Sequence, residues 1–208
     1  MKYNIFNLPS YVKFNEYIPS RGGARYVNTT YLYRADGTKL KKQYSYKDGP
    51  NLYLATKITE YIDGFQYERN ATLANPNASS LLKFLPTSEG YYDFQNNTYI
   101  YNYVDHLGNT RISFKREGNI AVIVKISDYY AFGLKHNTTI DSSDGNYKYE
   151  YNGKEIQEEL DMYDYGARFY MPDLGRWGVV DPLAEVTPHL SPYHYGNNNP
   201  IMYNDPTG

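Results

Sequence analysis

The chain has 208 residues, a formal net charge of −2 at pH 7 and no cysteine. This length is sufficient for one domain or two small ones with a buried core. The near-zero charge gives no electrostatic reason to expect a nucleic-acid partner. The lack of cysteine excludes disulfides, thiol catalysis and cysteine-ligated zinc.

Tyrosine dominates the aromatic residues, with 27 Tyr against 8 Phe and 1 Trp. Tyrosine favours strands, because its ring packs on a pleated surface while its hydroxyl reaches water or a polar partner. Disordered chains are poor in aromatic residues. The composition therefore predicts an ordered all-β protein with tyrosine-rich sheet faces.

Residues 1–25 contain no apolar segment of the kind found in signal peptides. No stretch of the chain approaches the 18 apolar residues of a membrane-spanning helix. We therefore expect no signal peptide and no membrane span in this sequence. Residues 1–25 match no recognisable motif and stay unassigned.

From residue 26 onward, tyrosines alternate with polar residues and a glycine turn follows, as in "YLYRADGTKL" at 31–40 and "YKYEYNGKEI" at 147–156. Asp-Gly and Asn-Gly tolerate the positive φ angles of tight hairpin turns. The pattern predicts antiparallel hairpins with tips at Asp36-Gly37, Asp48-Gly49, Asp63-Gly64, Gly108-Asn109, Gly118-Asn119 and Asn152-Gly153.

Helix signals are sparse. The segment 70–90 interrupts the strand pattern and is predicted to be a loop, with a short helical turn at 77–85. In "GKEIQEELDMY", Ile156, Leu160 and Tyr163 are spaced as on one face of a helix. The polar stretch 136–146 is a candidate connector, so we divide the chain into hairpins at 26–140 and a denser segment at 141–208.

The denser segment contains "NGKEIQEELDMYDYGARFYMPDLGRWGVVDPLAE" and ends in "SPYHYGNNNPIMYNDPTG". With these motifs and the tyrosine repeats, residues 30–208 resemble the Rhs/YD-repeat family, and 141–208 resemble its RHS repeat-associated core. The resemblance implies YD-repeat hairpins in a spiralling antiparallel sheet, closed by a turn-rich core plug with one or two short helices. In this family the sheet forms a shell that encloses a C-terminal toxin.

The resemblance also implies partners and a location. The expected partners are the C-terminal toxin domain of a parent chain and an upstream YD-repeat shell, with an immunity protein for the toxin as a further candidate. The chain would be secreted or lie at the cell surface as part of a larger exported protein. We expect no nucleic-acid partner, no cofactor and no metal.

Many family members cut their own chain just after a motif P-x-x-x-x-D-P-x-G-L. Pro200, Asp205, Pro206 and Gly208 match this motif, and the sequence ends before the leucine. The family's self-cleavage is thought to resemble aspartyl-protease chemistry, in which two close carboxylates activate a water. The resemblance thus makes Asp181 and Asp205 the candidate catalytic pair.

An arginine, Arg176 or Arg168, could hold a carboxylate ionised or steady the developing oxyanion. A competing interpretation remains open, since Asp-Pro steps are common in turns. In addition, Met171 occupies a position where many family members have aspartate. Any enzymatic activity is therefore at most autoproteolytic, and the printed sequence lacks the residue at which the cut would fall.

Two other functions compete with the shell. Exposed tyrosine and asparagine side chains can stack on sugar rings and bond their hydroxyls, so the alternative is a cell-surface carbohydrate-binding or adhesion module with surface glycans as partners. A third possibility is a recombination remnant without present activity.

Overall fold

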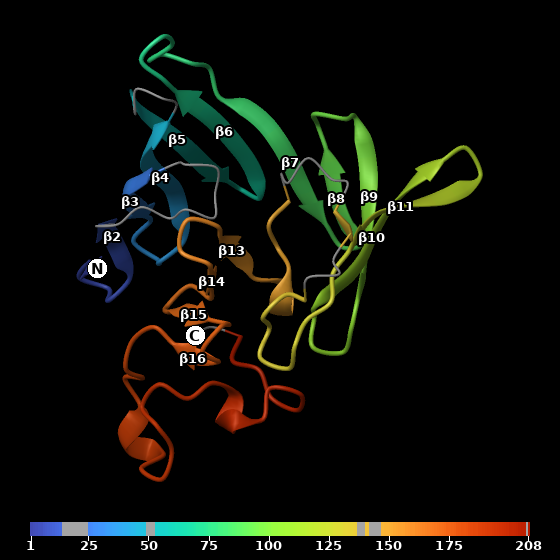
Figure 1. The fold of residues 1–208 in the computed structure, drawn as a ribbon. Helices are drawn as coiled ribbons and strands as arrows, with labels where there is room; N and C mark the ends of the chain where they lie inside the picture. Colours follow the sequence, from blue (N-terminus) through green and yellow to red (C-terminus); the bar gives the residue numbers. More distant parts are fainter. Residues whose placement is uncertain (14–24, 49–52, 137–139, 142–146, 207) are drawn as a thin grey trace. The chain divides into compact units, whose positions relative to one another are not determined.

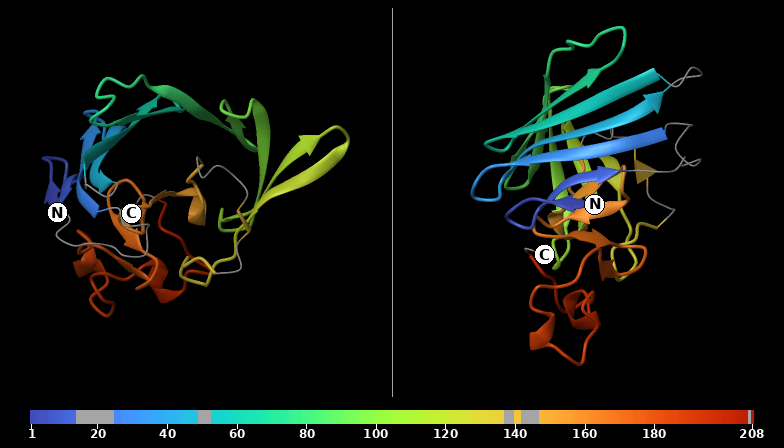
Figure 2. Two further views of the ribbon diagram at one scale, coloured as in Figure 1. Left: turned by 45° about the horizontal axis from the view of Figure 1, so that its top comes forward. Right: turned by 90° about the vertical axis from the view of Figure 1, so that its left-hand side faces the viewer.

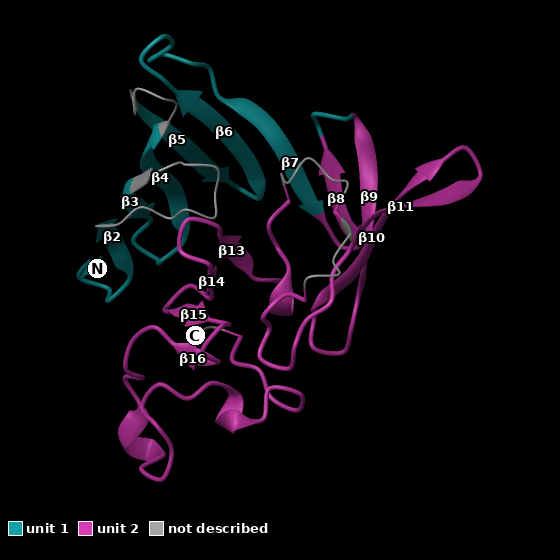
Figure 3. Ribbon diagram, in the orientation of Figure 1, with its two compact units in different colours: residues 1–86, 94–96 teal, residues 87–93, 97–208 magenta. Residues whose placement is uncertain are grey.

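The computed structural model describes residues 1–13, 25–48, 53–136, 140–141, 147–206 and 208. The chain divides into two compact units, residues 1–86 with 94–96 and residues 87–93 with 97–208 (Figure 3). This division follows spatial contacts, whereas the boundaries near residues 25 and 140 were drawn from sequence motifs. Those boundaries remain predictions.

Unit 1 is an antiparallel sheet whose strands pair in chain order (Figure 1). The strands β3, β4, β5 and β6 lie side by side in both views of Figure 2. The strands are β1 (Lys2–Tyr3), β2 (Pro9–Lys13), β3 (Arg25–Tyr33), β4 (Lys39–Asp48), β5 (Tyr53–Ile62), β6 (Phe65–Ala71) and β7 (Leu81–Thr87).

The hairpin tips of unit 1 follow the predicted turn chemistry. Gly37 has a φ of 87°, while Asp63 and Gly64 have φ values of 47° and 89°. The Asp36 carboxylate accepts a hydrogen bond from the Thr38 amide at 2.8 Å and so closes the first turn. These two tips are confirmed, whereas the tip predicted at Asp48-Gly49 extends outside the described residues.

The helical turn predicted at 77–85 is wrong. Residues 81–87 form β7, which pairs antiparallel with β6 in a register that places Gln66 opposite Phe84. The Phe84 side chain is almost fully buried. Pairing along β6 satisfies the backbone and buries this ring, which outweighs the weak local helix preference. The loop prediction therefore holds only for residues 72–80 and for the turn at 88–89.

Unit 2 begins with a second run of antiparallel strands that pair in chain order. Gly108 and Gly118, with φ values of 82° and 62°, form the turns on either side of β10, as predicted. The strands are β8 (Gly90–Asp93), β9 (Thr98–Val104), β10 (Thr110–Glu117), β11 (Ile120–Ile126) and β12 (Ile140–Asp141).

A small four-stranded antiparallel sheet follows, made of β13 (Glu155–Gln157), β14 (Met162–Asp164), β15 (Phe169–Met171) and β16 (Arg176–Trp177). The helix expected from the spacing of Ile156, Leu160 and Tyr163 is therefore wrong. Ile156 and Tyr163 are cross-strand partners in the β13–β14 hairpin. Their seven-residue separation reflects two strands that fold back on each other.

The described part of the chain contains no α-helix. Its short helices are single 3₁₀ turns in unit 2, at Tyr151–Gly153, Ala184–Val186 and Gly196–Asn198. The predicted tip at Asn152-Gly153 falls in the first of them, with positive φ at both residues. An antiparallel bridge between Tyr149 and Glu155 flanks this reversal.

Aromatic side chains form the core of unit 2. No member of this cluster is more than 4% exposed, and its members are Tyr151, Tyr163, Tyr165, Tyr170, Trp177 and Tyr195. The Tyr165 and Trp177 rings meet edge to face, with centroids 5.1 Å apart. Tyrosine thus fills the core itself as well as covering the sheet faces.

We predict that this tyrosine core makes the protein sensitive to alkali. Burial raises the pKa of Tyr165 and of Tyr170 in this cluster, and it also raises the pKa of Tyr147, outside the cluster, to about 12. Each raised pKa contributes stability that is complete below pH 10 and is lost as the pH rises through the folded-state value. The free energy of unfolding, measured in urea between pH 8 and 11.5, should fall steeply above pH 10.

The Tyr165→Phe variant is the matched control, because it removes one buried ionisable hydroxyl and keeps the ring. It should be about 1 kcal/mol less stable at pH 8, where a hydrogen bond is lost. Its stability should then fall less steeply with pH. An equal slope in both proteins would show that buried tyrosines do not drive the alkaline transition.

Candidate functional site

Arg168 lies in the turn between β14 and β15. The Tyr165 amide donates to the Arg168 carbonyl at 3.1 Å, and the Gly166 amide donates to the Asp164 carboxylate at 2.9 Å. Arg168 is only 6% exposed, and its Cζ lies 4.3 Å from the centroid of the Trp177 ring. The turn therefore places a permanent positive charge against the aromatic core.

The Arg168 guanidinium contacts both candidate aspartates. Its Nη1 lies 3.1 Å from Asp181 Oδ2, and its Nη2 donates to Asp205 Oδ2, also at 3.1 Å. The contact with Asp181 is an ion pair without hydrogen-bond geometry, and neither Nη1 nor Nε of Arg168 has a hydrogen-bond acceptor among the described residues. The fold thus brings the two carboxylates together on one cation.

The same two carboxylates also organise turns. Asp181 Oδ1 accepts a hydrogen bond from the Leu183 amide at 2.8 Å. Asp205 Oδ1 accepts one from the Gly208 amide at 3.0 Å. The turn role that competed with catalysis in the sequence is therefore present, and it coexists with pairing to Arg168.

Gly208 occupies a close-fitting place beside this pair. Its φ of +83° suits glycine, and a Cβ added there would lie 2.9 Å from Tyr165 Cβ and 3.2 Å from the Arg168 amide nitrogen. Any larger residue would need both neighbours to move. Of the other motif residues, Pro200 is buried and Pro206 is exposed.

Arg176 lies on β16 and makes a different contact. Its Nη1 donates to Asn198 Oδ1 at 2.6 Å. The interactions recorded for the described residues include none between Arg176 and either candidate aspartate. Its catalytic assignment stays a prediction, and Arg168 is the arginine that contacts the carboxylates.

Two residues of this site were missed from the sequence, although both belong to the "NGKE" motif that was interpreted as a turn. Asn152 Oδ1 accepts hydrogen bonds from the Tyr165 and Tyr195 hydroxyls, each at 2.6 Å. Lys154 Nζ donates to the Pro206 carbonyl. Burial lowers the pKa of Lys154, although Asp164 and Asp205 act in the opposite direction.

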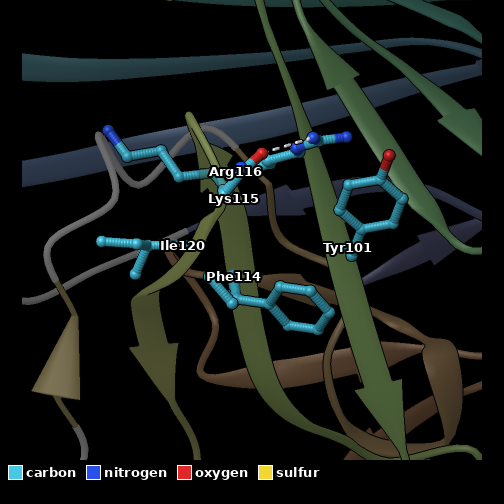
Figure 4. Close-up of a pocket in the computed structure, with 7 residues that line it drawn as sticks. Tyr101, Phe114, Lys115, Arg116 and Ile120 are labelled. Carbon is cyan, nitrogen blue, oxygen red and sulfur yellow. Dashed lines mark hydrogen bonds between the residues drawn. The ribbon is translucent and has the colours of Figure 1, made fainter.

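A second concave surface lies on β9, β10 and β11, with a cavity volume of about 520 Å³. Tyr101 and Phe114 are cross-strand partners whose rings stack with centroids 5.5 Å apart (Figure 4). Lys115, Arg116 and Asn119 line the same cavity. This pocket combines an aromatic surface with polar groups.

Within the residues that the structure describes, no group of three or more His, Asp or Glu side chains is arranged to hold a metal ion. No helix in that part of the chain is long and apolar enough to cross a membrane.

Comparison with known proteins gives partial matches in sequence. The chain is 30% identical over 112 residues to toxin subunit YenC1 of Yersinia entomophaga. The aligned segment covers 52% of this chain and 11% of that protein. It is also 33% identical over 115 residues to salivary gland surface protein 1 of Aedes aegypti. That aligned segment covers 55% of this chain and 3% of that protein. No protein-family model matches.

A solved structure matches the whole chain. The structure of TcdB2-TccC3 without its hypervariable C-terminal region superposes on 100% of this chain, and the match covers 10% of its own chain, with a TM-score of 0.76 and 21% sequence identity. This chain shares the fold of the matched part of TcdB2-TccC3. The matches support the predicted relation to the Rhs/YD-repeat family and confirm the all-β class, while the RHS repeat-associated core stays a prediction.

We predict that Arg168 holds the C-terminal turns together. The Arg168→Met variant keeps most of the side-chain volume but removes the cation from Trp177 and from both carboxylates. It should lose about 2–3 kcal/mol of unfolding free energy, as expected for a buried charged hydrogen-bonding group. Urea denaturation followed by tryptophan fluorescence would measure this loss.

Arg176→Met provides the matched control, because its contact with Asn198 involves one neutral partner. That variant should lose less than about 1 kcal/mol. Equal losses in the two variants would contradict a special role for the Arg168 cluster.

Proposed function

We propose that this chain is a wall and plug segment of an Rhs-type shell that encloses a C-terminal toxin. The observation that carries the proposal is the fold match to TcdB2–TccC3 along the full chain. The sequence similarity to toxin subunit YenC1 adds independent support. Because antiparallel strands follow one another in chain order, each added hairpin extends the wall without a crossover.

The chain spans about a tenth of the length of YenC1 and of the matched structure. The proposal therefore places it in a longer exported protein, with YD-repeat shell on its N-terminal side and a toxin on its C-terminal side. An immunity protein for that toxin is a further partner in this scheme.

The segment after Gly208 in that parent should be enclosed. After purification of the parent protein with its native flanking sequence, the downstream segment should co-elute with the shell. It should also resist a protease concentration that digests the same segment expressed alone. Equal digestion of the enclosed and the isolated segment would contradict the shell function.

We further propose that the plug cuts its own chain just after the leucine that completes the motif beyond Gly208, using Asp181, Asp205 and Arg168. Asp205 belongs to the cleavage motif and holds the Gly208 amide, while Asp181 comes from a separate turn. Arg168 contacts both carboxylates. The arrangement therefore gathers two potential proton carriers and a cation around the end of the motif that precedes the cut.

Arg168 suits the stabilisation of an oxyanion. Its Nε and Nη1 are buried and lack an acceptor among the described residues. A buried donor without an acceptor is costly. A carbonyl oxygen of the incoming peptide would satisfy such a donor, and the benefit would increase as negative charge develops on that oxygen.

The reaction consumes one water. One aspartate accepts a proton as the water oxygen bonds to the carbonyl carbon, and the other carboxyl group supplies a proton to the leaving nitrogen. The carbon–nitrogen bond then breaks, which leaves a new carboxylate and a new amine. Catalysis requires Asp181 or Asp205 to exchange its present backbone contact for the water.

The cleavage can be tested by fusing residues 1–208 through a leucine to a small folded reporter protein. Intact-mass spectrometry should detect separate shell and reporter fragments in the wild-type fusion. Asp181→Asn and Asp205→Asn should each leave the fusion uncut, because neither amide can accept the proton from water.

Asp173→Asn is the matched control, because Asp173 is an exposed residue of the β15–β16 turn. That variant should cut at the wild-type rate. An uncut wild-type fusion would reject self-cleavage and leave both candidate aspartates as turn residues.

The pocket on β9–β11 favours a second candidate function, which is carbohydrate binding. The stacked Tyr101 and Phe114 rings offer an apolar platform, and Lys115, Arg116 and Asn119 offer polar groups at its edge. Glycan-array binding by the chain, lost in Tyr101→Ala, would favour this function over a purely structural wall.

A further inference from the structure

Lys154 is held firmly by the main chain around it. It directly follows the 3₁₀ turn at Tyr151–Gly153, and its amide donates to the Tyr151 carbonyl at 2.9 Å. Its carbonyl accepts a hydrogen bond from the Glu150 amide at 3.0 Å. Both backbone groups of Lys154 are therefore fixed, which limits the positions that its side chain can reach.

The Lys154 ammonium lies between an aromatic ring and a peptide carbonyl. Its Nζ is 5.0 Å from the centroid of the Tyr165 ring and donates to the Pro206 carbonyl oxygen. The Tyr165 ring is itself fixed, because its hydroxyl donates to Asn152. The cation thus connects the aromatic core of unit 2 to the cleavage motif.

Desolvation accompanies this placement. Burial lowers the pKa of Lys154 from its usual value of 10.5, and the nearby Asp164 and Asp205 only partly offset that effect. A lysine that served solubility alone would extend into water. The ammonium instead remains beside Pro206, where it meets a backbone carbonyl.

The contacts of Lys154 complement those of Arg168. Arg168 Nη2 donates a hydrogen bond to Asp205 Oδ2, and the Gly208 amide donates one to Asp205 Oδ1. Lys154 holds the carbonyl of Pro206, which directly follows Asp205. The motif is therefore attached to the plug at consecutive points, which is more than a surface turn requires.

We propose that Lys154 is a positioning residue for self-cleavage, whose ammonium holds the Pro206 carbonyl and so sets the register of the bond that follows the motif. This inference rests on the self-cleavage proposed above. Without Lys154, the turn closed by Asp205 remains, but the segment can shift relative to Arg168 and Asp181. A displacement of about 1 Å can slow a positioned reaction by about 100-fold.

The leucine–reporter fusion tests this role through the first-order rate of cleavage. Lys154→Met removes the donor and keeps an unbranched side chain, so cleavage should slow by about 100-fold. Lys154→Arg keeps a charged donor and should restore part of the rate. Lys13→Met, at the exposed end of β2, is the control and should cut at the wild-type rate.

The pH profile separates positioning from a general structural role. In the wild-type fusion the cleavage rate should fall in alkali below pH 10.5, as Lys154 with its lowered pKa loses its proton. Arginine keeps its charge throughout this range. In Lys154→Arg, the decline of the cleavage rate at alkaline pH should therefore occur at higher pH than in the wild type. A loss of protein stability alone would not produce this shift.

The outcomes distinguish this inference from self-cleavage itself. An uncut wild-type fusion rejects both. A wild-type fusion that cuts, with Lys154→Met cutting at the same rate, overturns the role of Lys154 and leaves self-cleavage intact. Lys154→Met could also be slow because it fails to fold. In that case the folded Lys154→Arg variant tests the inference. If its cleavage rate declines at the same alkaline pH as in the wild type, the inference is overturned.

Discussion

The buried guanidinium of Arg168 is the constraint on which the C-terminal part of unit 2 depends. A permanent cation at 6% exposure requires compensation, because burying an unpaired charge is costly. The Trp177 ring lies against the flat face of the guanidinium, and the carboxylates of Asp181 and Asp205 contact the guanidinium nitrogens. Pairing with Arg168 therefore fixes the turns of Asp181 and Asp205 relative to the sheet of β13–β16. The C-terminal motif that ends at Gly208 is held by these charged contacts in a region that has almost no regular structure.

Tyrosine makes such a core possible, since each buried ring also carries a hydroxyl that needs a partner. Asn152 accepts two of these hydroxyl groups, from Tyr165 and Tyr195, and is itself held by Asn109 through its amide. The Tyr170 hydroxyl donates to the Phe132 carbonyl at 2.8 Å. The aromatic cluster thus binds irregular backbone as well as filling volume. A core of leucine would fill the same space without providing these directional contacts.

The C-terminal motif contacts two cations from different turns of unit 2. Lys154 stands at the start of β13 and contacts Pro206, while Arg168 stands before β15 and contacts Asp205. The Tyr165 ring connects the two cations, because it lies 5.0 Å from Lys154 Nζ and packs on Trp177, against which Arg168 lies. A self-processing function would thereby be linked to the correct folding of the small sheet.

The sequence by itself determined the all-β class, the turns at Asp36-Gly37 and Asp63-Gly64, and the pairing of strands in chain order. These features are local, because glycine and its neighbour set the φ angles of each turn and alternation sets the faces of each strand. Only the tertiary structure decided that residues 81–87 and 155–157 are strands, because their pairing with β6 and β14 outweighs local helix preference. It likewise decided that Arg168, rather than Arg176, contacts the two aspartates and that Lys154 contacts the motif. Those contacts join residues far apart in the chain, and spacing along a sequence carries no information about which charge a distant turn will meet.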